Sequence, residues 1–211
     1  PTLGTELRKA GYRPQLFGYT DTAQDPRVLS PDDPRLQSYE EVMAGFEETV
    51  QMRMESGDQP WRNHLAAHGI ALPDYPETYR PVGDDIRDPA LYPAELSDTA
   101  FLTDRFLQEM NSAASGWFGL LTYIRPHPPL VAPAPYNSMF DPGDMPRAET
   151  DSGDWHPFLG PARTKQTPSS MVVGFPGLKA SEETTAALRA IYLGLASEVD
   201  HHIGRVISWL K

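Results

Sequence analysis

The chain has 211 residues with 18 basic and 29 acidic side chains, which gives a formal net charge of −11 at neutral pH. That acidic balance argues against a nucleic-acid partner, because binding to a phosphate backbone needs clustered basic residues. No apolar run approaches the roughly 18 residues that span a membrane, so we expect no membrane partner either. The chain contains no cysteine, which excludes disulfides, thiolate metal sites and a cysteine nucleophile from these residues. The compartment stays open, with the cytoplasm slightly favoured.

The first half of the chain is predicted to alternate short helices with extended segments. Leu3 and Leu7 share one face of a helix, for which Gly11 is a natural stop. The elements expected up to residue 97 are a helix ending at Gly11, a strand over 14–19, a polar loop over 20–38, a segment over 39–54 that is ambiguous between helix and strand, a short helix over 59–68 and a loop over 70–97.

The second half contains the clearest patterns. Asp98 or Thr99 can cap a helix, and residues 117–124 then form an almost continuous apolar run. Such a run is typical of a strand buried on both faces of a parallel sheet. A Pro-rich loop over about 125–180 is long enough to indicate a functional or capping insertion. From Ser181 to the last residue, apolar side chains recur at three- and four-residue steps and predict an amphipathic helix.

The order helix–strand–helix–strand–helix predicts an α/β layered fold. Ligands of open α/β sheets bind beyond the carboxyl ends of the strands. Two segments are expected at that edge: residues 18–22 after the first strand, and residues 125–129 after the buried one. These two segments are therefore the first candidates for a functional site.

Residues 123–137 read Tyr-Ile-Arg-Pro-His-Pro-Pro-Leu-Val-Ala-Pro-Ala-Pro-Tyr-Asn. This segment resembles the Lys/Arg-Pro-His-x-Pro element of the sulfatases and phosphonate monoester hydrolases of the alkaline phosphatase superfamily. Residues 2–22 and 192–210 are similar to further parts of the same family, whereas residues 50–97 are only weakly similar. The resemblance implies an alkaline-phosphatase-like layered sheet with flanking helices, incomplete here. Residues 1–211 would form the central part of a single sulfatase-type domain, with the Pro-rich insertion at about 125–180.

The resemblance also implies metal-assisted hydrolysis of sulfate esters or of phosphonate or phosphate esters. Family enzymes attack through a formylglycine, and divalent ions such as Mn or Ca hold the nucleophile and the substrate. In the family, the motifs for both lie upstream and downstream of the matched segment. We therefore expect neither group to be bound by this chain alone, and we expect the isolated chain to be inactive. The expected partner is a small anionic ester, and a homo-oligomer stays open.

Four residues correspond to the family's site. His127 is the candidate catalytic residue, because an imidazole can contact anionic oxygens or protonate a leaving oxygen near neutral pH. Tyr19, Arg125 and Asp21 are candidate substrate-binding residues, and no metal ligand is assigned. Tyr19 and Arg125 favour the phosphonate monoester hydrolase branch. Asp21 stands where the family has His or Thr, and its carboxylate would repel an anionic substrate unless it turns away, meets a cation or changes the specificity.

Each of the four candidates also has a simpler structural interpretation. His127 could pack between prolines, and Tyr19 could be a half-buried aromatic at a strand end. Arg125 could pair with a carboxylate or position its loop, and Asp21 could cap a turn. A rival function is a non-catalytic module that keeps the scaffold and a pocket but not the chemistry.

Other polar segments are interpreted as structural. His64 and His68 stand four residues apart on a helix without a general base between them, so we expect an exposed pair. Asp200, His201 and His202 are expected on a solvated helix surface, whereas the Asp154-Trp155-His156 segment could rim a pocket. Three strings mimic family metal or nucleophile motifs outside their usual context: residues 67–69, 84–88 and 159–163.

Overall fold

The computed structural model describes residues 1–37, 40–147, 156–159 and 167–211. The chain forms two compact units. The first unit comprises Pro1–Gly69, Asp98–Ile124 and Arg205–Lys211, and the second comprises Ile70–Ser97 and Arg125–Gly204. That these units belong to one sulfatase-type domain stays a prediction.

A parallel three-stranded sheet forms the centre of the first unit. Its strands are β1 (Arg13–Gly18), β2 (Glu47–Gln51) and β3 (Trp117–Leu121), in the order β2-β1-β3. Gly18 aligns with Gln51 and Phe17 with Leu121, so all three strands end at the same edge of the sheet. The α/β prediction is confirmed, and the ambiguous segment over 39–54 contains a strand.

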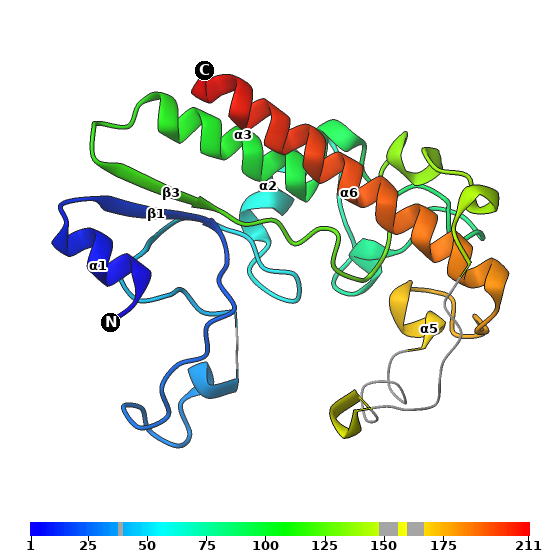
Figure 1. The fold of residues 1–211 in the computed structure, drawn as a ribbon, viewed down its shortest axis with the longest axis horizontal. Coiled ribbons are helices and arrows are strands. Elements are labelled where there is room, and N and C mark those ends of the chain that lie inside the picture. Colours follow the sequence, from blue (N-terminus) through cyan, green and yellow to red (C-terminus); the bar gives the residue numbers. More distant parts are fainter. Residues whose placement is uncertain (38–39, 148–155, 160–166) are drawn as a thin grey trace. The chain divides into compact units, whose positions relative to one another are not determined.

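Three helices flank this sheet: α1 (Leu3–Lys9), α2 (Gln59–Ala67) and α3 (Asp98–Asn111). Thr2 caps α1 through its side chain, which accepts a hydrogen bond from the backbone of Thr5. The Phe106 ring of α3 meets Phe17 of β1 edge-on, with 5.2 Å between the ring centroids. In Figure 1, α1 and α3 lie on opposite sides of β1 and β3. The core of this unit therefore forms where α3 covers the sheet.

The prediction that 117–124 is a strand buried on both faces is wrong in two respects. The strand ends at Leu121, and each of its five residues is only half-buried. β3 pairs with β1 on one side, and no strand among the described residues pairs with its other edge. Directly after the strand, the backbone N–H of Thr122 donates to the carbonyl of Phe17 in β1 (2.9 Å).

The second unit has no strand within its described residues and is built from loops, short turns and helices. The helices are α5 (Pro168–Met171) and α6 (Glu182–Leu210), of which α6 extends into the first unit from Arg205. The Ser181 hydroxyl accepts a hydrogen bond from the Thr184 backbone and caps α6, as predicted. Short 3-10 turns occur in both units at Pro34–Gln37, Glu77–Tyr79, Ala94–Leu96, Tyr136–Ser138, Pro142–Asp144 and Pro157–Leu159.

A small apolar core holds the second unit together. It contains Leu130, Ala132, Val172, Ile191 and Leu195. Two of these come from the Pro-rich segment just after residue 125, so the start of that segment is packed rather than a surface loop. Its backbone is tied by hydrogen bonds from Leu130 to Met171 (2.6 Å) and from Ala90 to Ala132 (3.0 Å).

The prediction of a solvated surface at residues 200–202 holds for Asp200 and His201, which are exposed, but it is wrong for His202, which is buried. The helical period explains the difference. Leu195, Glu198 and His202 follow one another at three- and four-residue steps, and all three are buried on one face of α6.

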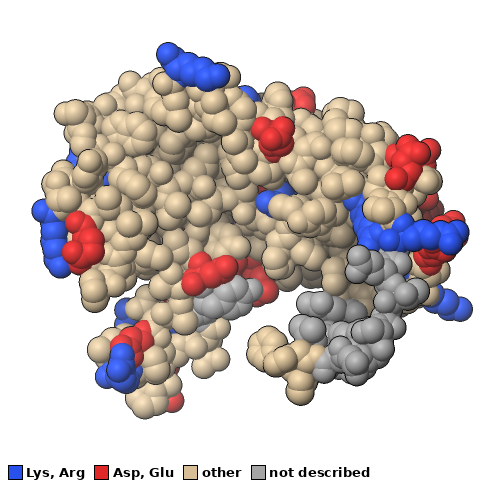
Figure 2. All heavy atoms as spheres, viewed as in Figure 1, with Lys and Arg blue, Asp and Glu red and all other residues tan. Residues whose placement is uncertain are grey.

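The described residues carry charges of both signs at the surface. On the face shown in Figure 2, basic side chains lie singly or beside acidic ones. Arg27 pairs with Asp25 and Arg35 with Asp33, each at 2.7 Å; the two arginines are exposed and Asp33 is half-buried. Among the described helices, none is long and apolar enough to cross a bilayer.

Candidate functional site

A threonine clamp closes the sheet edge where β1 ends. The backbone N–H of Tyr19 donates to the Thr122 hydroxyl oxygen (2.9 Å), and that hydroxyl donates to the carbonyl of Tyr19 (2.8 Å). Gly18, the last residue of β1, has a φ of +114°, and a Cβ there would lie 2.2 Å from the Thr122 hydroxyl oxygen. Only glycine fits this position, and the clamp fixes where Tyr19 leaves the sheet.

The turn after Tyr19 is held by a second threonine. Thr20 is buried, its hydroxyl donates to the carbonyl of Glu41 (2.6 Å), and it accepts from the Met43 backbone (2.9 Å). Thr22 extends the contact through an isolated parallel bridge to Glu40. The segment after β1 is thus joined to the segment that leads into β2. Sequence reasoning missed Thr20, because its partners lie about twenty residues away.

The two sequence candidates on this turn differ in exposure. Tyr19 is half-buried and Asp21 is exposed. The Asp21 carboxylate makes no hydrogen bond to the described residues, so turn capping does not explain it; the Thr20 side chain fastens this turn instead. A role of Tyr19 and Asp21 in substrate binding stays a prediction.

Glu40 is an acidic residue at this edge that sequence reasoning did not select. Its side chain is buried, and Oε1 accepts a long hydrogen bond from the Met54 backbone (3.4 Å). Burial raises the pKa of the Glu40 carboxyl, and the nearby carboxylates of Glu55 and Asp21 raise it further. Carboxylates therefore gather at this edge, and Asp21 is one of them.

In the second unit, Arg125 points inward. It is 3% exposed; Nη1 donates to the carbonyl of Pro129 (2.9 Å) and Nη2 to the Tyr92 hydroxyl (3.2 Å). The guanidinium carbon lies 4.4 Å from the centroid of the Tyr79 ring, a cation–π contact. This geometry favours the interpretation in which Arg125 positions its loop. Contact between Arg125 and a substrate stays a prediction.

His127 lies on the loop that Arg125 fastens, and it is exposed. Its Nδ1 is hydrogen-bonded to the carbonyl of Pro128, and a carbonyl can only accept, so Nδ1 carries a proton. Nε2 is therefore the ring nitrogen that remains available to a ligand. Toward a ligand, Nε2 is a hydrogen-bond acceptor when the ring is neutral and a donor when the ring is an imidazolium.

The candidates fall into two pairs. Tyr19 and Asp21 share a turn of the first unit, and Arg125 and His127 share a loop of the second. The meeting of the two pairs around one anion stays a prediction. Among the residues that the structure describes, no three His, Asp or Glu side chains are grouped to hold a metal ion.

The remaining motif-like segments have structural surroundings. His64 is half-buried against Phe101, with 5.3 Å between the ring centroids, which corrects the expectation of an exposed pair; His68 is exposed at the end of α2. Asp85 accepts from the Arg87 backbone (2.8 Å) within a turn. Residues 154–155 and 160–163, from the Asp-Trp-His segment and the nucleophile-like string, lie outside the described residues.

Comparison with known proteins identifies the family. The family model described as Sulfatase matches residues 1–211. The chain belongs to the sulfatase family. It is 35% identical over 222 residues to the multifunctional alkaline phosphatase superfamily protein PehA of Trinickia caryophylli, which covers 99% of this chain and 43% of that protein. The family prediction drawn from residues 2–22, 123–137 and 192–210 is confirmed.

Two solved structures agree with this assignment. The chain matches the phosphonate monoester hydrolase SpPMH from Silicibacter pomeroyi with a TM-score of 0.91 and 53% identity, over 100% of this chain and 44% of that one. It matches the phosphonate monoester hydrolase of Agrobacterium radiobacter with a TM-score of 0.80 and 33% identity, over 100% and 44% of the two chains. The alkaline-phosphatase-like fold is confirmed, and the chain spans less than half the length of these relatives.

Proposed function

We propose that the intact protein is a hydrolase of phosphonate, phosphate or sulfate esters, and that this chain supplies His127 and Tyr19 to its substrate pocket. The observation that carries the proposal is the match to a phosphonate monoester hydrolase over the whole chain at 53% identity. Tyr19 and the Arg125-Pro-His127 element favour phosphonate esters among the three.

The proposed role of His127 follows from its hydrogen bond. With Nδ1 held by the Pro128 carbonyl, Nε2 of the imidazolium is a fixed donor toward a ligand. Such a donor binds an anionic ester oxygen, or it gives its proton to the leaving oxygen as the bond to phosphorus or sulfur breaks. The loop that carries His127 is held in place because the Arg125 side chain donates hydrogen bonds to the Pro129 carbonyl and the Tyr92 hydroxyl.

The proposed role of Tyr19 is to donate its phenol proton to an oxygen of the substrate. The Thr122 clamp fixes the Tyr19 backbone on both its N–H and its carbonyl, which limits where the ring can go. Asp21, two residues on, is exposed and negatively charged beside that position. It would disfavour a dianionic ester relative to a monoanionic one, such as a phosphonate monoester.

A divalent ion (Mn or Ca) and a formylglycine nucleophile remain proposals for the intact protein. The described residues contain no ligand cluster for the ion, and the sequence has neither the Cys-x-Pro-x-Arg element that carries the formylglycine precursor nor the same element with Ser in place of Cys. We therefore assign to this chain only binding, positioning and proton transfer. By itself it should not turn over sulfate, phosphate-diester or phosphonate esters in the presence of Mn²⁺ or Ca²⁺, and metal-dependent turnover by the isolated chain would refute this assignment.

Replacing His127 by alanine in the intact protein tests the proposal. We expect kcat/KM for a phosphonate monoester to fall by about 10²- to 10⁴-fold, the range for a proton-transfer group. His68→Ala is the matched control, because His68 is also an exposed histidine, and it should leave kcat/KM unchanged. If both variants retain the wild-type kcat/KM, His127 has no part in the reaction.

A further inference from the structure

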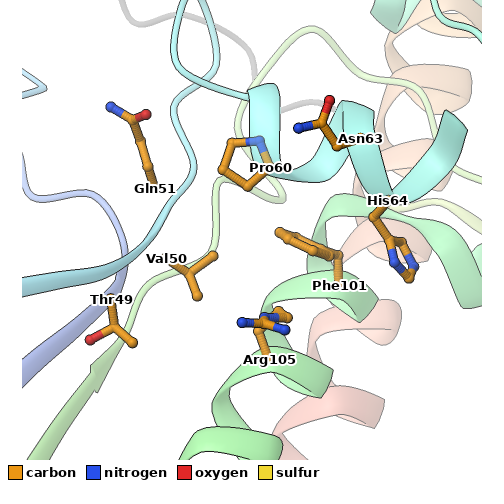
Figure 3. A pocket seen from close by; sticks show the side chains of 8 residues that line it. All are labelled: Thr49, Val50, Gln51, Pro60, Asn63, His64, Phe101 and Arg105. Carbon is orange, nitrogen blue, oxygen red and sulfur yellow. The ribbon is translucent and has the colours of Figure 1, made fainter. Parts of the chain in front are cut away.

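A cavity of about 360 Å³ opens beside the edge strand of the first unit (Figure 3). It is lined by residues of three elements: β2, α2 and α3. Pockets for small molecules have volumes of roughly 300–1,000 Å³ and combine an apolar floor with a few polar groups. This cavity has both features.

The apolar part of the cavity consists of Val50, Pro60 and Phe101. Val50 and Phe101 are almost fully buried, at 5% and 4% exposure, so they are fixed by the packing around them. The His64 imidazole packs against the Phe101 ring, with 5.3 Å between the centroids. Only the edge of this rigid aromatic ring is therefore open to a ligand, and it forms part of the apolar floor of the cavity.

The polar part of the cavity lacks negative charge. Its five polar lining residues include no Asp or Glu, although acidic residues outnumber basic ones in the chain. Burial lowers the pKa of His64, and the nearby His68 lowers it further, so the ring is neutral at pH 7 and Arg105 supplies the cavity's charge. Figure 3 shows the Arg105 guanidinium extending from α3 toward β2.

Arg105 keeps donors for a ligand. A guanidinium has five N–H groups. One is given to Gln108 (3.0 Å) and one to Glu109 (3.3 Å). The ion pair with Glu109 joins two side chains that are 39% and 35% exposed, and such pairs are weak. The side-chain oxygen of Asn63 (Oδ1) accepts a hydrogen bond from the Gln59 side chain (2.7 Å). The two N–H groups of the Asn63 side-chain amide therefore remain as donors at the cavity wall.

We propose that this cavity binds a small organic anion with a planar apolar body. The oxyanion head, a carboxylate or a phosphonate, takes hydrogen bonds from the Arg105 guanidinium, and the apolar body lies against Pro60 and the exposed edge of the Phe101 ring, in the direction of Asn63 (Figure 3). Arginine suits this role because its planar fork matches an oxyanion with two parallel hydrogen bonds. The proposal is independent of the hydrolase function, since it concerns binding and not turnover.

The test measures binding of three probes to the intact protein by ligand-observed NMR titration. Benzoate and phenylphosphonate carry the two candidate heads on one ring, and benzyl alcohol is the neutral counterpart. Neither anion contains an ester bond, so hydrolysis does not interfere. We expect the preferred anion to bind with a dissociation constant of about 1 mM or below, and benzyl alcohol to bind at least about tenfold more weakly.

Arg105→Gln removes the charge and keeps a polar side chain. It should weaken binding of the preferred anion by about tenfold or more, and it should leave benzyl alcohol unaffected. Arg27→Gln, at an exposed loop position, is the matched control for loss of one positive charge, and it should change nothing. Phe101→Leu keeps a buried apolar side chain and should weaken all three probes. Equal affinities for the anions and the alcohol, or unchanged anion binding in Arg105→Gln, would overturn the proposal.

Discussion

Gly18→Ala probes the clamp that positions Tyr19. The backbone at Gly18 has a φ of +114°, which costs an L-residue about 1–2 kcal/mol. The new Cβ would also lie 2.2 Å from the Thr122 hydroxyl oxygen and 2.5 Å from its carbonyl oxygen. Overpacking of this kind costs a further 1–3 kcal/mol or so, and the carbonyl cannot rotate away as a side chain could. We expect the free energy of unfolding to fall by about 2–5 kcal/mol.

Gly11→Ala is the matched control. Gly11 also has a positive φ, +87°, but no atom lies within 4 Å of the Cβ position, and the residue is exposed. Alanine there meets the backbone cost alone, about 1–2 kcal/mol. The difference between the two variants therefore isolates the contact with Thr122.

Urea denaturation of the intact protein measures the free energy of unfolding of both variants, provided that its dependence on urea concentration is the same as in the wild type. Gly18→Ala should in addition lower kcat/KM for a phosphonate monoester, because the displaced residue is the one before Tyr19. Gly11→Ala should leave kcat/KM unchanged. Equal losses of stability in the two variants would show that the close approach to Thr122 has no energetic consequence. The proposed role of the Thr122 contact in positioning Tyr19 would then be refuted.

Two further predictions concern buried polar groups. Arg125→Lys should lower kcat/KM, because an ammonium cannot bond two acceptors and stack on a ring in the same way. If Arg125 acts by positioning His127, Arg125→Lys should cause no further loss of kcat/KM in a His127→Ala variant. Additive losses in the double variant would instead indicate direct contact between Arg125 and the substrate. The pKa of the Glu40 carboxyl is higher in the folded than in the unfolded protein. Its contribution to stability is therefore fully present below pH 4.5, the ordinary pKa, and is lost as the pH rises through the raised pKa. Glu40→Gln should therefore stabilise the protein relative to wild type more at pH 7 than at pH 4, and a pH-independent difference in denaturation midpoints would contradict the assigned cause.

The elements that the sequence predicts well are those whose burial pattern is local. α6 follows from apolar side chains at helical spacing, and β1 is expected at the short segment around Leu16 and Phe17 that follows the first helix. β2 does not follow in this way, because Glu47, Glu48 and Thr49 are exposed or half-buried and only Val50 is buried. Its extended form depends on pairing with β1, a contact between residues that are far apart in the sequence.

The family motifs predict which segments matter, but they do not tell which way each side chain faces. In the sequence, Arg125 and His127 are neighbours around a proline and could both address a ligand. In the structure one is buried and the other is exposed. The difference arises from Tyr92, 33 residues earlier, whose hydroxyl accepts from the guanidinium, and from the Tyr79 ring beneath it.

The same reasoning applies to the edge of the sheet where β1 ends. Thr20 and Thr122 are ordinary residues in the sequence, yet each satisfies backbone groups of a distant segment, and together they determine where Tyr19 can lie. A buried hydroxyl or guanidinium is stable only where partners offset its loss of water, so its position depends on the whole fold. Local patterns cannot contain that information. Substitutions at these supporting residues should therefore change the site as strongly as many substitutions at the motif itself.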